Sequence, residues 1–251
     1  MMITIMLIIF TGCGGERGNC SSTEQYEQAR LTAEQGLPQA QVHLGHMYYL
    51  GQGGLPQDYE QAVYWYRLAA EQEHMLGQNA LGYMYLHGLG VPQNYEQAEY
   101  WLRLAAEQRS VAAQFNLGQM YKDGFVSKDY EQAVYWFRLA AEQRFAIAQF
   151  SLGYMYYHDL GVVQDYEQAA YWFRLAAEQG LAEAQFNLGY MYYLGQGGLP
   201  RNYEQAVYWY RLAADQGFAE AQHNLGYMYQ QGFGVPQNHR QAAHWLRLAV
   251  E

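Results

Sequence analysis

The chain has 251 residues, of which 51% are apolar and 17% aromatic, so it can bury a sizeable core. Its formal net charge is -10, and only 14 residues are Lys or Arg. A basic strip that would displace counterions from phosphates is therefore missing, which excludes nucleic acid as an expected partner.

The first segment in chain order, residues 1–12, is apolar and too short to span a membrane. Small residues, Thr11 and Gly12, precede Cys13, and the segment resembles a lipoprotein signal, in which that Cys is lipidated and becomes the first mature residue. We expect residues 1–12 to direct export, Cys13 to carry a lipid anchor and residues 13–24 to form a linker. An ordinary secretory signal is the alternative. The expected location is the bacterial periplasm or outer membrane, or outside the cell.

The rest of the chain repeats one phrase, which "DYEQAVYWYRLAAEQ" from Asp58 exemplifies. All six tryptophans occupy the same place in it, at intervals of 36, 35, 36, 37 and 36 residues. Such a period predicts a stack of units, each of which contacts only its neighbours. We expect a partial repeat helix at residues 25–35, followed by units at residues 36–72, 73–108, 109–143, 144–179, 180–216 and 217–251.

Each unit is predicted to be a hairpin of two helices. Apolar residues in the first half of a unit recur at i, i+4, i+7 and i+8, which places them on one helical face. In the fifth unit these are Ala184, Leu188, Met191 and Tyr192. The second half carries a similar stripe, formed in the same unit by Tyr203, Ala206, Trp209, Tyr210 and Ala213.

Helix ends are marked by explicit signals. Every second helix is predicted to open on Asp or Asn with Gln three residues later, the pattern in which both side chains satisfy backbone N–H groups. The six N-cap residues are Asp58, Asn94, Asp129, Asp165, Asn202 and Asn238. First helices mostly end on Gly, as at Gly195, because Gly tolerates the left-handed conformation of a C-terminal cap.

Two further residues recur at fixed places. A glycine such as Gly189 lies in the middle of every first helix, where Gly costs about 0.8 to 1 kcal/mol relative to Ala. We therefore expect a neighbouring helix to approach there with its Trp ring. An Arg such as Arg211 precedes an acidic residue by four positions in five units, and it is expected to pair within or between second helices.

The combined pattern, "A-x-x-x-L-G-x-M-Y-x-x-G-x-G-V-x-Q-D-Y-x-x-A-x-x-W-x-x-x-A-A-x-Q-G", resembles Sel1-like repeats, which are relatives of the tetratricopeptide repeat. The resemblance covers residues 36–251 in six units. It implies an all-α fold, an α/α superhelical solenoid of helix-turn-helix repeats. It also implies that the first helices line a concave face that serves as an adaptor or scaffold for other proteins.

If the resemblance holds, three positions of each first helix, away from the Leu and Met stripe, face that groove. The expected partner-binding residues are His43, His46, Tyr83, His87, Asn116, Gln119, Tyr154, His158, Asn187, Tyr190, Asn224 and Tyr227. Such a groove is aromatic and rich in amides, which suits an extended or helical peptide segment. The alternative interpretation is that the tyrosines only bridge adjacent helices.

Catalytic and metal-binding patterns are absent from the sequence, so no cofactor is expected. The eight histidines are scattered, and only His43 and His46 are spaced closely enough to share a ligand. Some cysteine-rich Sel1-like proteins carry a disulfide in each helical pair and are linked to β-lactam binding or hydrolysis. Because Cys13 and Cys20 both precede the repeats, a non-enzymatic scaffold is favoured over a cell-wall-active or β-lactam hydrolase.

The last repeat raises a separate expectation. A repeat array normally shields its terminal hairpin with a polar capping unit, and the sixth unit is not followed by one. We therefore expect self-association through the last repeat, or a longer natural chain.

Overall fold

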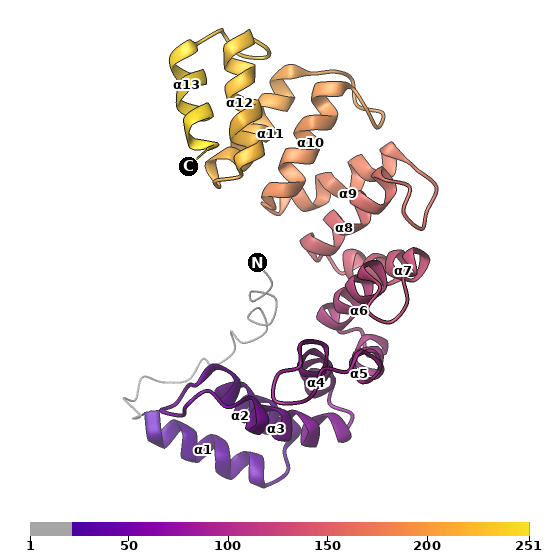
Figure 1. Ribbon diagram of the computed structural model, residues 1–251, viewed down its shortest axis with the longest axis vertical. Coiled ribbons are helices and arrows are strands. Elements are labelled where there is room, and N and C mark those ends of the chain that lie inside the picture. The colour runs from indigo at the N-terminus through magenta and orange to yellow at the C-terminus, as the bar shows by residue number, and fades with distance from the viewer. Residues whose placement is uncertain (1–21, 251) are drawn as a thin grey trace. The chain divides into compact units, whose positions relative to one another are not determined.

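The computed structural model describes residues 22–250, with side chains from Tyr26 onward. Within this range the chain forms thirteen α-helices and no strand (Figure 1). The expected signal segment and Cys13 lie outside the described residues. Helix α1, Ser22–Glu34, begins inside the stretch that the sequence predicted to be a linker.

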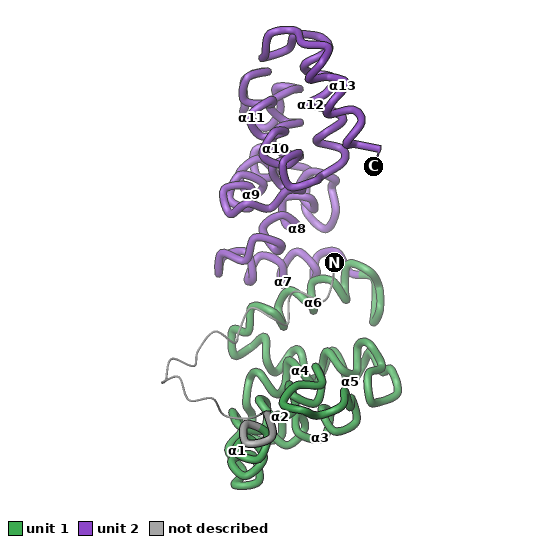
Figure 2. The backbone as a smooth tube through the Cα atoms, turned by 90° about the vertical axis from the view of Figure 1, so that its left-hand side faces the viewer, with its two compact units in different colours: residues 1–128 green, residues 129–251 purple. Residues whose placement is uncertain are grey.

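The helices divide into two compact units, residues 1–128 and 129–251 (Figure 2). The first unit contains α1, then α2 (Pro38–Leu50), α3 (Tyr59–Glu71), α4 (Met75–His87), α5 (Tyr95–Glu107) and α6 (Val111–Asp123). The second contains α7 (Tyr130–Glu142), α8 (Ala146–Tyr157), α9 (Tyr166–Glu178), α10 (Ala182–Leu194), α11 (Tyr203–Asp215), α12 (Ala219–Gln231) and α13 (His239–Leu248). The boundary falls between the two helices of the third expected repeat.

Within each unit, every helix packs against the next one along the chain. The core is correspondingly divided into separate clusters, and one of them joins Ala169 and Phe173 of α9 to Leu188 and Met191 of α10. The predicted all-α solenoid of helix-turn-helix repeats is confirmed, because burial is shared only between neighbouring hairpins.

The predicted contact between the mid-helix glycines and the Trp rings is wrong. A methyl group on Gly189 would lie 2.9 Å from Cδ1 of Tyr210, and one on Gly153 would lie 2.8 Å from Cδ1 of Phe173. The residue after the Trp therefore fills this space, since it faces the first helix of its own hairpin. Trp209 instead packs against the cluster that α9 and α10 form together.

The predicted N-caps are confirmed in one half only. At all six second helices the cap side chain accepts a hydrogen bond from the backbone N–H of the Gln, as Asp58 does from Gln61 at 2.9 Å. The reciprocal bond, which would run from the Gln side chain to the backbone N–H of the cap residue, is replaced by a bond to the first helix. The backbone N–H of Asp58 donates to the Tyr48 carbonyl at 2.9 Å, which ties the second helix to the first.

The first helices end largely as predicted. Gly195 takes a left-handed conformation, with φ of 74°, and its N–H donates to the Met191 carbonyl. Helix α8 differs, because Asp159 holds the left-handed position with φ of 58°. The Asp159 carboxylate accepts a hydrogen bond from the Gln164 backbone N–H at 3.0 Å, which stabilises the turn in place of a glycine.

The recurring Arg does not pair with the acidic residue four positions later. Arg67 donates to the Tyr85 hydroxyl at 3.0 Å, and Arg211 donates to the Tyr229 hydroxyl at 2.6 Å. Each bond joins a second helix to the following first helix. Arg103 also forms an ion pair within its own helix, with Glu99, four residues earlier, at 2.6 Å.

A chain of buried glutamines, which the sequence analysis missed, links neighbouring hairpins. The side chain of Gln185 donates to the Ala177 carbonyl of the preceding hairpin at 3.2 Å. Its oxygen accepts from the side chain of Gln216, at the end of its own hairpin, at 2.8 Å. The same position of each first helix is a buried Gln, and these residues are Gln41, Gln78, Gln114, Gln149, Gln185 and Gln222.

Candidate binding surface on the first helices

All twelve predicted partner-binding residues lie on first helices or at their ends. We call the side of each unit that carries them the first-helix face. Tyr154, Tyr190 and Tyr227 are 41%, 37% and 40% exposed, so their rings are available to a partner. The histidines His43, His87 and His158 are also exposed, whereas His46, Asn116 and Gln119 are half-buried.

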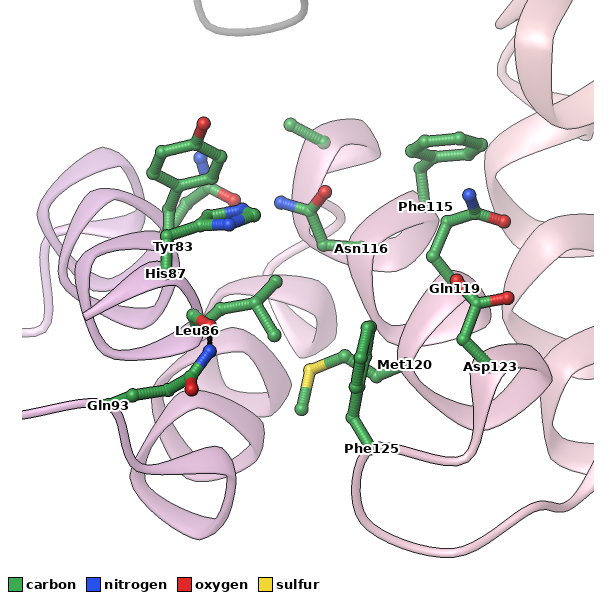
Figure 3. A pocket seen from close by; sticks show the side chains of 12 residues that line it. Tyr83, Leu86, His87, Gln93, Phe115, Asn116, Gln119, Met120, Asp123 and Phe125 are labelled. Atoms are coloured by element: carbon green, nitrogen blue, oxygen red, sulfur yellow. Dashed lines mark hydrogen bonds between the residues drawn. The ribbon is translucent and has the colours of Figure 1, made fainter. Parts of the chain in front are cut away.

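In the first unit, four of the predicted residues surround one cavity of about 300 Å³. Tyr83 and His87 reach it from α4, and Asn116 and Gln119 reach it from α6 (Figure 3). The cavity is lined further by residues that the sequence analysis did not assign to the site, namely Asn79, Leu86, Gln93, Ala112, Phe115, Met120, Asp123 and Phe125. It is therefore largely apolar and aromatic, with a few polar groups.

Tyrosine and histidine pair along the first-helix face at a spacing of four residues. The ring centroids of Tyr83 and His87 lie 4.2 Å apart, and those of Tyr154 and His158 lie 4.1 Å apart. Burial lowers the pKa of His87 below its ordinary value, which favours the neutral imidazole at neutral pH. The pKa of His46 is lowered in the same direction by burial and by His43.

Several tyrosines of this face also bridge adjacent helices. In the second unit, Tyr190, Asn224 and Tyr227 line a smaller cavity of about 160 Å³. There Tyr227 lies beside Tyr193, and Asn224 lies beside Tyr210, around the same cavity. The bridging role that the sequence left open is therefore present, alongside rings that remain partly exposed.

A second set of exposed tyrosines lies on the second helices and was not considered from the sequence. Its members, each about half exposed, are Tyr64, Tyr100, Tyr135, Tyr171 and Tyr208. Each meets the adjacent Trp edge to face, as Tyr208 does with Trp209 at a centroid distance of 5.0 Å. These tyrosines resemble those of the first-helix face in exposure and differ in location.

No group of three or more His, Cys, Asp or Glu side chains within residues 22–250 is placed to hold a metal ion. None of the helices in this range combines the length and apolar character needed to cross a bilayer. Lys122, the amine near the expected groove, lies 3.5 Å from the carboxylate of Asp123.

Comparison with known proteins identifies the repeat. The profile of the family described as Sel1 repeat matches residues 38–74, 76–110, 111–145, 146–181, 182–218 and 219–251. None of the curated proteins matches the chain.

Two solved structures are similar over most of the chain. One is a protective antigen of uropathogenic Escherichia coli strains that displays an SLR fold, with a TM-score of 0.86 and 40% identity. The match covers 90% of this chain and 48% of the antigen, so this chain spans about half of the antigen's length. The other is a Sel1 repeat protein from Oxalobacter formigenes, with a TM-score of 0.75 and 30% identity, covering 92% of this chain and 97% of that one.

Proposed function

The chain belongs to the Sel1 repeat family, and from this premise we propose that it is a non-enzymatic scaffold that binds a protein or peptide partner along its first-helix face. The observation that carries the proposal is the convergence of Tyr83, His87, Asn116 and Gln119 on one open cavity. A rigid frame of repeats presents these side chains, and such frames change partners through a few surface residues.

The chemistry of the face suits a polypeptide. Half-exposed aromatic rings supply contact area at a small cost in side-chain entropy, and the amides of Asn and Gln donate and accept hydrogen bonds. Peptide recognition on helical grooves uses this combination of apolar pockets and fixed polar groups. The acidic net charge of -10 also favours a partner that is not itself strongly acidic.

The proposal extends to location and assembly. Export, with a lipid anchor at Cys13, is supported by the apolar segment and the small residues before that Cys. Self-association through the last repeat is supported by Leu246 of α13, which is half-buried where Leu102, at the same place of α5, is fully buried. Sedimentation at several concentrations tests the second point, and mass spectrometry of the mature protein tests the first.

The scaffold proposal is tested by capture from extracts of the native host. The immobilised wild-type protein is expected to retain a defined partner, and the variant with Tyr83, Tyr154 and Tyr190 changed to Ala is expected to lose it. The matched control changes Tyr64, Tyr100 and Tyr171, exposed tyrosines of the second helices, to Ala. Equal capture by both variants would exclude the first-helix face.

The alternative, a hydrolase, is tested on the same preparation. We expect no turnover of a chromogenic β-lactam by the purified wild-type protein. Turnover that persists through a second, independent purification would replace the scaffold proposal with an enzymatic one.

A further inference from the structure

Asn79 breaks the pattern of its repeat position. At the position five residues before the recurring Met, the six repeats carry Val42, Asn79, Phe115, Phe150, Phe186 and His223. Asn79 is 9% exposed, so a polar side chain occupies a buried place where three units have Phe. The shorter side chain leaves open part of the 300 Å³ cavity between α4 and α6 that it lines.

The carbonyl oxygen of Asn79 needs a hydrogen-bond donor. Oδ1 of Asn79 is shielded from solvent and has no hydrogen-bond partner among the described residues, and the same holds for Oε1 of Gln119. An unsatisfied buried acceptor is destabilising. Both residues line the same cavity, so a ligand that brings N–H groups into it can satisfy these oxygens once the amides turn toward it.

The remaining lining supplies negative charge and aromatic surface. The carboxylate of Asp123 lines the cavity and lies 3.5 Å from the Lys122 amine, and the rings of Tyr83 and Phe125 flank the space (Figure 3). The amide of Gln93 already donates to the Leu86 carbonyl at 2.8 Å. Because burial favours the neutral form of His87, that ring adds no positive charge that would repel a cation.

We propose that this cavity binds an arginine side chain of the partner protein, a proposal that rests on the scaffold function above. A guanidinium group offers five donors and no acceptor, which matches a site of unpaired acceptors and a carboxylate. Its flat face stacks on aromatic rings, and its aliphatic stem packs against Leu86 and Met120. A lysine carries a compact charge with three donors and fits this arrangement less well.

The probe for this proposal is N-acetyl-arginine amide, titrated into the ¹⁵N-labelled full chain. We expect saturable shifts of the Asn79 side-chain amide signals, with binding at least about tenfold weaker for the citrulline analogue, which lacks the charge. The lysine analogue is expected to bind more weakly than the arginine one. Equal binding of the lysine or leucine analogue would overturn the assignment to arginine.

Two variants separate the acceptor from the space. Asn79→Phe introduces the residue that three of the other repeats carry and fills the cavity, so we expect it to stay folded and to lose arginine binding. Asn79→Leu keeps the approximate size and removes the acceptor, and it is expected to weaken binding about tenfold. Tyr208→Ala, at an exposed position of α11 outside the first-helix face, is the control and should bind like the wild type. Unchanged binding in both Asn79 variants would overturn the proposal.

The two proposals fail in different ways. If Asn79→Phe captures the same partner from host extract as the wild type does, the arginine site is wrong and the scaffold stands. If arginine binds saturably while the tyrosine variants of the first-helix face capture everything that the wild type captures, the scaffold proposal is wrong and the cavity still binds a guanidinium group.

Discussion

Two buried tyrosines show what a single hydroxyl contributes. Tyr66 and Tyr210 occupy the same place in their units, and each is 1% exposed. Tyr210 lies beside the amide of Asn224 at one small cavity, whereas the Tyr66 hydroxyl is shielded and unpartnered within the described chain. The difference has a local cause, because the repeat that follows Tyr66 has Ala80 where the repeat that follows Tyr210 has Asn224.

Removing these hydroxyls is expected to have opposite effects. Tyr66→Phe relieves an unsatisfied buried group and should stabilise the fold by about 1 kcal/mol. Tyr210→Phe removes a hydroxyl that lies beside the amide of Asn224 and can pair with it, so it should destabilise the fold by about 1 kcal/mol. Urea unfolding of both variants measures the difference. A similar loss in both would mean that the Tyr66 hydroxyl has a partner in solution.

The contact partners of residues were predicted well where both partners are close in the sequence and poorly where they lie on different helices. The N-cap side chains were predicted because a cap bonds only three residues ahead, as Asp58 does. The partner of Gly189 was assigned to Trp209 instead of Tyr210 because a helical stripe is wide. Adjacent residues are about 100° apart on a helix, and a periodic pattern does not say which neighbouring helix each one meets.

At the scale of the element, buried glutamines join each first helix to the helices on either side of it. Because Gln is polar, a pattern of hydrophobic residues does not reveal this role, even though Gln185 is only 4% exposed. Because Gln185 bonds both the Ala177 carbonyl and Gln216, it links two consecutive second helices through α10. Buried groups that are fully satisfied in this way fix the register of packed elements.

Replacing one of these glutamines tests the linkage between hairpins. Gln185→Leu keeps the approximate size and removes both bonds, so it should destabilise the fold by about 1 to 3 kcal/mol. Gln222→Leu is the matched control, since the described residues show only its bond to the Ala214 carbonyl, at 3.1 Å. We expect a smaller loss there, measured by urea unfolding. An equal or larger loss for Gln222→Leu would contradict the two-sided linkage.

At the scale of the whole molecule, the repeat fold was predictable because every contact that builds it recurs. The interval between tryptophans implies hairpins that pack on their neighbours, and each compact unit is built in that way. The arginine cavity was not predicted, because it depends on one departure from the repeat, Asn79, and on a missing hydrogen bond. A pattern search averages such departures away, whereas a comparison of the units position by position would have exposed this one.

Alkaline pH should destabilise the folded protein. Burial raises the pKa of seven described tyrosines above the ordinary value of about 10, and these are Tyr48, Tyr49, Tyr66, Tyr121, Tyr157, Tyr193 and Tyr210. For Tyr48 and Tyr121 the pKa rises to about 12. The folded state therefore keeps protons that the unfolded chain releases, and stability falls as pH rises.

The pH range of this loss of stability follows from the raised pKa values of the buried tyrosines. Stability that depends on neutral tyrosines is fully present below about pH 10 and is lost progressively between about pH 10 and 12. Helical circular dichroism should be lost in one cooperative step, together with the part of the tyrosinate absorbance that comes from these buried tyrosines. The double variant with Tyr66→Phe and Tyr210→Phe offsets its two effects near neutral pH, yet it removes two buried ionisable groups. We expect its alkaline midpoint to lie at higher pH than that of the wild type, and an unchanged midpoint would show that burial of these hydroxyls does not drive the transition.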